Sequence, residues 1–185
     1  QVEQVLQLAV LDRGTYRLKH ETFDLHQLLE KISGNFQLIV KERKGTVKLL
    51  LDAKNHRVHA DIMHIENVIT NLLDNANKYS PDTPEITLST FNRNDHIVIA
   101  VEDKGIGINT ENQKHIFRKM FRVHTGNLHD VKGFGLGLYY VKSLIEAHNG
   151  TINLHSEPGK GSRFEISLPL DFLNYVSQNQ KLHES

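Results

Sequence analysis

The stretch DVKGFGLGLYYVKSLIEAHNG, residues 130–150, places three glycines on alternate positions at the start of a run with helical periodicity. These are Gly133, Gly135 and Gly137, and the run predicts a helix over residues 136–148. Glycine at the mouth of a helix carries an entropic penalty, so three of them need a reason. The pattern indicates either a tight loop or the close approach of a ligand to the backbone, and helix N-termini favour anions such as phosphate.

Two common phosphate-binding loops do not match this stretch. A dinucleotide-binding loop requires Gly-x-Gly-x-x-Gly directly after a strand, whereas these glycines follow Gly-x-Gly-x-Gly after a long irregular segment. A P-loop requires Gly-Lys-Ser or Gly-Lys-Thr at the start of the helix, and neither occurs there. The stretch therefore belongs to neither of these loops.

Length, charge and composition narrow the possible functions. The chain has 185 residues, which suits a single domain with a short attached segment. Lys and Arg number 22, as do Asp and Glu, so no net charge attracts nucleic acid, and we expect no nucleic-acid partner. The lack of cysteine excludes disulfides and thiolate metal sites. No apolar run reaches the ~20 residues of a membrane span, and no signal peptide is visible.

Three segments have distinctive hydrophobic patterns. Residues 2–11 predict an apolar helix that needs a partner, and because the sequence begins at Gln1 rather than Met, we expect a piece of a longer protein. The unbroken apolar run at residues 97–101 predicts a strand buried on both faces. Residues 108–132 lack periodicity and are rich in basic and polar residues, which predicts a mobile segment.

The order of the remaining elements predicts the fold class. Three helices against five or six strands, joined by hairpins rather than repeated crossovers, indicate an α/β fold: a two-layer sandwich in which a mixed sheet packs on about three helices. Helices are expected at residues 24–41 and 61–79 besides 136–148; strands are expected at 47–51, 57–60, 85–91, 96–102, 151–156 and 163–168, with hairpin turns at 92–95 and 157–161.

The helix expected at residues 61–79 carries a polar face. Asn71, Asn75 and Lys78 are four and three residues apart, so they lie together, turned away from the apolar stripe. A solvated surface explains most such sets, but Asn is a poor helix former compared with Ala, which favours a functional reason. Amide oxygens suit a hard cation such as magnesium, which binds through a few protein oxygens plus phosphates.

The segment EDKGIGI, residues 102–108, ends an expected buried strand. Asp103 lies at the end of that strand, where its carboxylate can accept a hydrogen bond from an exocyclic amine such as that of adenine. Gly105 and Gly107 would let a flat ring approach the backbone. An ordinary Asp-Lys-Gly turn is the alternative for this segment taken alone.

The motifs resemble one family when they are taken in order and with their spacing. NLLDNANKYS is similar to the Asn box of the catalytic, ATP-binding domain of two-component sensor histidine kinases, and DKGIGI and GFGLGL are similar to its two glycine boxes. IFRKMFRV resembles its Phe box, with Arg118 and Met120 departing from the usual residues, and GKGSRFEISLPL resembles its final glycine box and closing strand. The resemblance covers about residues 21–170.

The resemblance implies a fold and a domain organisation. The expected fold is the Bergerat fold of the GHKL superfamily of ATPases and kinases. LQLAVLDRGTYRLKHETFDL, residues 6–25, is similar to the junction between the dimerisation hairpin and the catalytic domain. The expected organisation is the end of a dimerisation helix with a linker at residues 1–20, the ATP-binding domain at 21–170 and a C-terminal tail at 171–185.

The resemblance also implies roles for individual residues. Asn71, Asn75 and Lys78 form the implied catalytic set, in which Asn75 holds magnesium, Asn71 supports it and Lys78 reaches a phosphate. Asp103 bonds the adenine amine. Residues 119–135 form a lid over the nucleotide. The other implied nucleotide-binding positions are Tyr79, Gly105, Gly107, Ile108, Phe117, Arg122, Lys132, Gly133, Gly135, Leu136, Gly137 and Leu138.

The implied activity is transfer of the ATP γ-phosphoryl group to a histidine, a reaction that depends on positioning and electrostatics. None of the 12 histidines stands in the family's acceptor context, so the acceptor is expected on a dimerisation helix that this sequence lacks. The implied partners are that histidine-phosphotransfer helix, a response-regulator receiver domain and a second copy in a homodimer. The implied location is the cytoplasmic part of a membrane-anchored bacterial sensor.

Two alternatives stay open at the level of sequence. One is an ATP-hydrolysing relative in the same superfamily, for which Glu66, one turn before Asn71, is a conceivable general base. The other is a degenerate module that binds nucleotide or a partner without phosphotransfer, against which the intact Asn75, Asp103 and glycine loops argue.

Overall fold

The computed structural model describes residues 18–122 and 135–170. The helix expected at residues 2–11 and the tail at 171–185 lie outside the described residues, as do Lys132 and Gly133.

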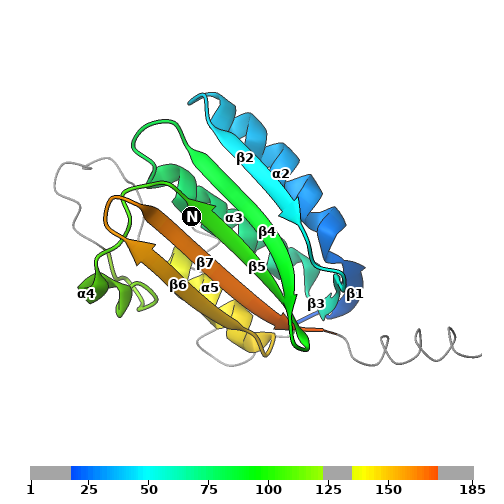
Figure 1. The fold of residues 1–185 in the computed structure, drawn as a ribbon. Coiled ribbons are helices and arrows are strands. Elements are labelled where there is room, and N and C mark those ends of the chain that lie inside the picture. The colour runs from blue at the N-terminus through cyan, green and yellow to red at the C-terminus, as the bar shows by residue number, and fades with distance from the viewer. Residues whose placement is uncertain (1–17, 123–134, 171–185) are drawn as a thin grey trace, which may run out of the picture.

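The core of the fold is a mixed five-stranded sheet that carries three long helices on one face (Figure 1). Strands β2 and β4 pair in parallel, and all other neighbours pair antiparallel. This confirms the predicted two-layer α/β sandwich. The strand order is β2 (Thr46–Leu51), β4 (Glu85–Arg93), β5 (His96–Asp103), β7 (Gly161–Pro169) and β6 (Thr151–Glu157), and the helices are α2 (Leu25–Lys41), α3 (Ile62–Lys78) and α5 (Gly137–Ala147).

A second, two-stranded sheet lies beside the main one. It pairs β1 (Glu21–Asp24) with β3 (Arg57–Ala60) in antiparallel register. The described residues therefore form seven strands, so the expectation of five or six was wrong. The four residues of β1 do not alternate between buried and exposed positions, whereas the four residues of β3, which was predicted, do. A short helix, α4 (Thr110–Gln113), begins the segment in which no regular structure was expected.

Two of the three long helices, α2 and α3, begin at a capping side chain. Asp24 caps α2, where its carboxylate accepts hydrogen bonds from the N–H groups of His26 and Gln27. Asp61 caps α3 in the same way, through the N–H of His64. Both caps satisfy donors that a helix N-terminus leaves without partners. The helices predicted at residues 24–41 and 61–79 are thus confirmed, with an aspartate at the start of each.

The β4–β5 hairpin turns later than expected. Strand β4 continues to Arg93, so the turn consists of Asn94 and Asp95 instead of residues 92–95. Asn94 has φ 55, the left-handed conformation that two-residue hairpin turns require and that Asn tolerates. The other predicted hairpin is also tighter, because β6 and β7 extend to Glu157 and from Gly161.

Strand β5 is buried on both faces, as its apolar run predicted. Ile97, Ile99 and Val101 belong to the core beneath the helices, whereas Val98 and Ala100 point to the opposite face and are also fully buried. No described helix covers that face. Instead, long side chains from neighbouring strands shield it through ion pairs: Arg93 to Glu165 (3.1 Å), Arg163 to Glu165 (3.0 Å) and Arg163 to Glu102 (2.7 Å).

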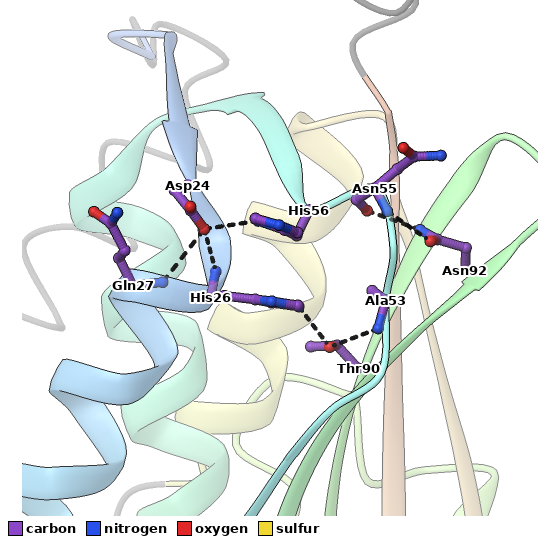
Figure 2. A network of polar contacts seen from close by, with 8 residues as sticks. All are labelled: Asp24, His26, Gln27, Ala53, Asn55, His56, Thr90 and Asn92. Atoms are coloured by element: carbon purple, nitrogen blue, oxygen red, sulfur yellow. Dashed lines mark hydrogen bonds and ion pairs between the residues drawn. The ribbon is translucent and has the colours of Figure 1, made fainter.

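A polar network joins the start of α2 to the main sheet (Figure 2). The Asp24 carboxylate contacts His56 Nδ1 at 2.8 Å, and the His56 ring stacks on the His26 ring with centroids 4.1 Å apart. His26 Nε2 lies 2.9 Å from the Thr90 hydroxyl on β4. The network thereby ties the cap of α2 to the middle of the sheet.

Candidate functional site

The polar face of α3 lies opposite the start of α5. Asn71 donates a hydrogen bond from Nδ2 to the Asn67 carbonyl oxygen (2.8 Å), which leaves its Oδ1 turned toward α5. A Cβ placed on Gly137, the first residue of α5, would lie 3.2 Å from that oxygen. The fold thus brings the Asn-rich helix and the glycine-rich stretch together, as the sequence analysis expected.

Asn75 and Lys78 extend this face toward the end of α3. Neither side chain makes a hydrogen bond or ion pair with another residue that the structure describes, so an amide oxygen and an ammonium group are left for a ligand. Asp74 lies beside them. The pKa of its carboxyl is raised by burial, although the Lys78 charge opposes this shift. Sequence reasoning missed Asp74 because a single Asp next to Asn75 has no distinctive spacing.

The Asp103 carboxylate is buried at the end of β5 and only 7% exposed. Its Oδ1 accepts hydrogen bonds from the N–H of Gly105 (2.8 Å) and from the N–H of Ser162 (3.2 Å) on β7. Among the described residues, no group donates to Oδ2. The pKa of Asp103 is raised, mainly by burial. The two N–H donors oppose this shift, and the Glu102 charge adds to it.

Two glycines after Asp103 lie so close to neighbouring backbone that no side chain would fit at either position. A Cβ on Gly105 would overlap the Tyr79 carbonyl oxygen, which also accepts a hydrogen bond from the N–H of Ile106 (3.1 Å). Gly107 has φ +67, and a Cβ there would overlap the Glu157 carbonyl. The end of α3, the Asp103 loop and the β6–β7 hairpin therefore form one continuous wall.

Ser156 fixes the position of Ile108 in this wall. The Ser156 hydroxyl accepts a hydrogen bond from the Ile108 N–H (2.8 Å) and donates one to the Gly161 carbonyl (2.8 Å). Gln113, at the end of α4, donates to the Ile108 carbonyl (2.7 Å) and to the Ser156 carbonyl (2.8 Å). Ser156 and Gln113 were not predicted, because only the folded chain brings them to the glycine loop.

Helix α5 begins without a side-chain cap. Its N-cap residue is Leu136, whose side chain accepts no hydrogen bond from the first N–H groups of α5, and a helix N-terminus favours an anion. Gly135, just before it, packs against the carbonyl of Phe121. Two parts of the predicted lid, on either side of residues 123–134, therefore lie side by side.

The remaining predicted site residues lie around this region or outside the described residues. Phe117 packs edge-on against Phe164 of β7, with ring centroids 6.4 Å apart. Leu136 and Leu138 pack against the core while partly exposed, and Arg122 is exposed. Contact of these residues with a nucleotide stays a prediction, as it does for Lys132 and Gly133.

Together, these features define a class of protein. A mixed sheet with helices on one face carries a buried carboxylate at a strand end, an Asn-rich helix and an uncapped glycine-rich helix start, and that combination is typical of an ATP-binding domain. The chain belongs to the family described as histidine kinase-, DNA gyrase B-, and HSP90-like ATPases, whose model matches residues 60–172.

Curated relatives are sensor kinases. The sensor protein RprX of Bacteroides fragilis is 47% identical over 172 residues, which is 92% of this chain and 33% of RprX. The sensor histidine kinase TmoS of Ectopseudomonas mendocina is 34% identical over 183 residues, which is 97% of this chain and 19% of TmoS. The chain thus spans a third or less of the length of these two relatives.

Solved structures share the fold. The histidine kinase AdeS of Acinetobacter baumannii superimposes with a TM-score of 0.72 at 28% identity, covering 92% of this chain and 77% of that one. Full-length ShkA in complex with AMPPNP superimposes with a TM-score of 0.80 at 22% identity, covering 91% of this chain and 35% of ShkA.

Among the helices that the structure describes, none combines the length and apolar character that a membrane crossing needs.

Proposed function

We propose that this chain is the catalytic domain of a sensor histidine kinase, which binds ATP with magnesium and transfers the γ-phosphoryl group to a histidine on a dimerisation helix. The observation that carries the proposal is the asymmetric environment of Asp103. Two N–H groups hold its Oδ1, and no described residue donates to its Oδ2. A fixed, buried acceptor of this kind suits the exocyclic amine of adenine.

The phosphates would lie between α3 and the start of α5. Lys78 would supply a positive charge there, and the N-terminus of α5, which the Leu136 side chain does not cap, would favour the same anion. Asn75 would hold magnesium together with the phosphates, since an amide oxygen is a suitable ligand for that ion, and Asn71 would support it and contact the phosphates. Bound magnesium would neutralise negative charge as the γ-phosphoryl group is transferred. The described residues fit such a site, because the Asn75 amide has no hydrogen bond to any of them.

The acceptor and the partners follow from the same proposal. The γ-phosphoryl group would pass to a histidine ring nitrogen on a dimerisation hairpin, and from there to the aspartate of a response-regulator receiver domain. The whole protein would work as a homodimer, with this domain on the cytoplasmic side of a membrane-anchored sensor. The support is that RprX and TmoS are named as sensors, and that the related fold of ThkA was solved in complex with the response regulator TrrA.

One observation disfavours the ATP-hydrolysing alternative. Glu66, the conceivable general base, forms an ion pair with Lys31 of α2 at 3.3 Å. Its carboxylate therefore faces α2 and not the Asn71 side of α3, where the phosphates would lie.

The experiment that tests the proposal is an ATP titration with and without magnesium, followed by phosphoryl transfer to a supplied histidine hairpin. Binding without transfer would favour the degenerate module.

A further inference from the structure

Arg43 makes an unusual set of hydrogen bonds to the segment that follows α3. It lies in the turn after α2, and its guanidinium reaches residues 77–82, which are more than 30 positions away in the sequence. Nη1 donates to the Asn77 carbonyl (2.6 Å) and to the Asn77 side-chain oxygen (3.0 Å). Nη2 donates to the carbonyls of Ser80 (2.5 Å), Pro81 (3.2 Å) and Asp82 (2.9 Å).

These bonds complete the C-terminal cap of α3. The last carbonyls of a helix lack partners within the helix, and the helix dipole favours a cation at that end. Two of them are satisfied locally, the Asn75 carbonyl by the Tyr79 N–H (3.0 Å) and the Ala76 carbonyl by the Ser80 hydroxyl (2.8 Å). Arg43 satisfies the Asn77 carbonyl and then three more in the following loop. A planar guanidinium with several donors suits this task better than an ammonium.

The turn that Arg43 caps is part of the nucleotide site. The last turn of α3 carries Asn75 and Lys78, and Tyr79 follows directly. The Tyr79 carbonyl accepts the Ile106 N–H, and Gly105 packs against it. The position of this turn therefore sets the distance between the phosphate-facing side chains of α3 and the Asp103 loop.

We propose that Arg43 is a positioning residue for nucleotide binding: it holds the end of α3 against the Asp103 loop without touching the nucleotide. This inference rests on the proposed ATP site and adds a residue to it. Without Arg43, three loop carbonyls and the last turn of α3 lose their shared donor. The turn then frays, and a nucleotide must order it again on binding. The free energy of that ordering weakens the observed nucleotide affinity.

The structure offers a matched control for a merely structural role. Lys31 also joins α2 to α3, through Glu66 at 3.3 Å, but it does so in the first half of α3. Lys31→Gln removes this single ion pair from α2, whereas Arg43→Gln removes the five hydrogen bonds that the turn after α2 makes to the end of α3 and the loop that follows it. Only the Arg43 contact lies next to Asn75, Lys78 and Tyr79.

The test is ATP and ADP titration of the 185-residue chain and of Arg43→Gln, Arg43→Lys and Lys31→Gln by calorimetry. We expect Arg43→Gln to weaken both nucleotides by about tenfold, the order produced when a binding site loses preorganisation. Arg43→Lys should restore part of the loss, and Lys31→Gln should bind as the unmodified chain does. Circular dichroism checks that each variant is folded at the titration temperature.

Hydrogen exchange separates positioning from global destabilisation. In the nucleotide-free Arg43→Gln variant, the amides of residues 77–80, 82 and 105–107 should exchange faster, while those of β5 and β7 remain protected. Unchanged nucleotide affinity in Arg43→Gln, or an equal loss in Lys31→Gln, would overturn the inference. So would exchange that rises uniformly over the whole domain. If the unmodified chain bound no adenine nucleotide, the proposed function itself would be wrong.

Discussion

Ser162 donates its backbone N–H to Oδ1 of Asp103 across the β5–β7 pair at 3.2 Å, and the two residues are register partners in the sheet. The final glycine box therefore helps to orient the carboxylate that the first glycine box carries. Because Oδ1 is already engaged, Oδ2 is the oxygen that would recognise the amine of a ligand in the proposed site.

Asp103→Asn should weaken binding of ATP and ADP by about ten- to a hundredfold. The substitution keeps the shape but replaces a charge-assisted acceptor, which contributes roughly 1.5–3 kcal/mol. Calorimetric titration of the chain and the variant measures the change. Asp95→Asn, in the exposed β4–β5 turn, is the control and should bind normally. Equal affinities in the chain and Asp103→Asn would remove Asp103 from the site.

Nucleotide affinity should also fall as the pH drops through the pKa of Asp103, which lies above the ordinary Asp value. Burial raises the pKa of Asp103, so it takes up a proton at a higher pH than an ordinary Asp does. That proton goes to Oδ2, since Oδ1 accepts two N–H bonds, and an O–H would then oppose the adenine amine. Below that pKa the dissociation constant should rise as the pH falls, and it should level off at about the ten- to hundredfold loss expected for Asp103→Asn. The difference between the pH profiles of the chain and Asp103→Asn isolates this effect, and parallel profiles would contradict it.

Asn75→Ala should reduce magnesium-dependent ATP binding more than magnesium-free ADP binding. The amide oxygen is a suitable ligand for magnesium, whose main task is to manage phosphate charge. Titrations of both nucleotides with magnesium and with a chelator test this. Asn77→Ala is a poor control, because its side chain bonds Arg43; Thr70→Ala, on the same helix, is better. Equal losses under both conditions would indicate a folding defect instead.

Much of the fold and part of the site could be predicted from the sequence, for physical reasons. The hydrophobic periods of α2 and α3 are local signals, and they located both helices correctly. Asp103 and the glycine boxes were found because they form ordered motifs. Ser156, Gln113 and Arg43 were not, because their contacts join positions five to 48 residues apart and no motif marks them. Strand β1 was missed because its four residues do not alternate between buried and exposed positions.

Stability should fall as the pH drops below about 6.5, the ordinary pKa of histidine. His148 Nε2 accepts the Asp61 N–H (3.1 Å), and Nδ1 lies 2.7 Å from the Leu144 carbonyl, an arrangement that requires a neutral ring. The pKa of His148 is lowered, mainly by burial. The charges of His20 and His64 also lower it, whereas the Leu144 carbonyl and the Asp61 charge oppose the shift. Burial also lowers the pKa of His64, against the Asp61 charge that raises it.

The sign of the effect follows from these shifts. In the window between the folded and unfolded pKa values, the unfolded chain binds more protons than the folded chain, so the free energy of unfolding decreases as pH falls. Thermal melts between about pH 7.5 and 5 measure it. His148→Gln should be less stable near neutrality but show a flatter profile, whereas exposed His155→Gln should keep the original slope. A flat profile for the unmodified chain would refute this account of the buried histidines.

Phosphoryl transfer from labelled ATP and magnesium tests the central claim most directly. None of the 12 histidines stands in an acceptor context, so the 185-residue chain alone should gain no acid-labile phosphate. The same chain with a sensor-kinase dimerisation hairpin fused upstream should become labelled on the acceptor histidine, because tethering raises the acceptor to an effective concentration of about millimolar. The label should then pass to a receiver-domain aspartate. Stoichiometric phosphohistidine on the chain alone, or no labelling of the fusion although it binds ATP, would contradict the assignment of this chain as the phosphoryl-donating half of a histidine kinase.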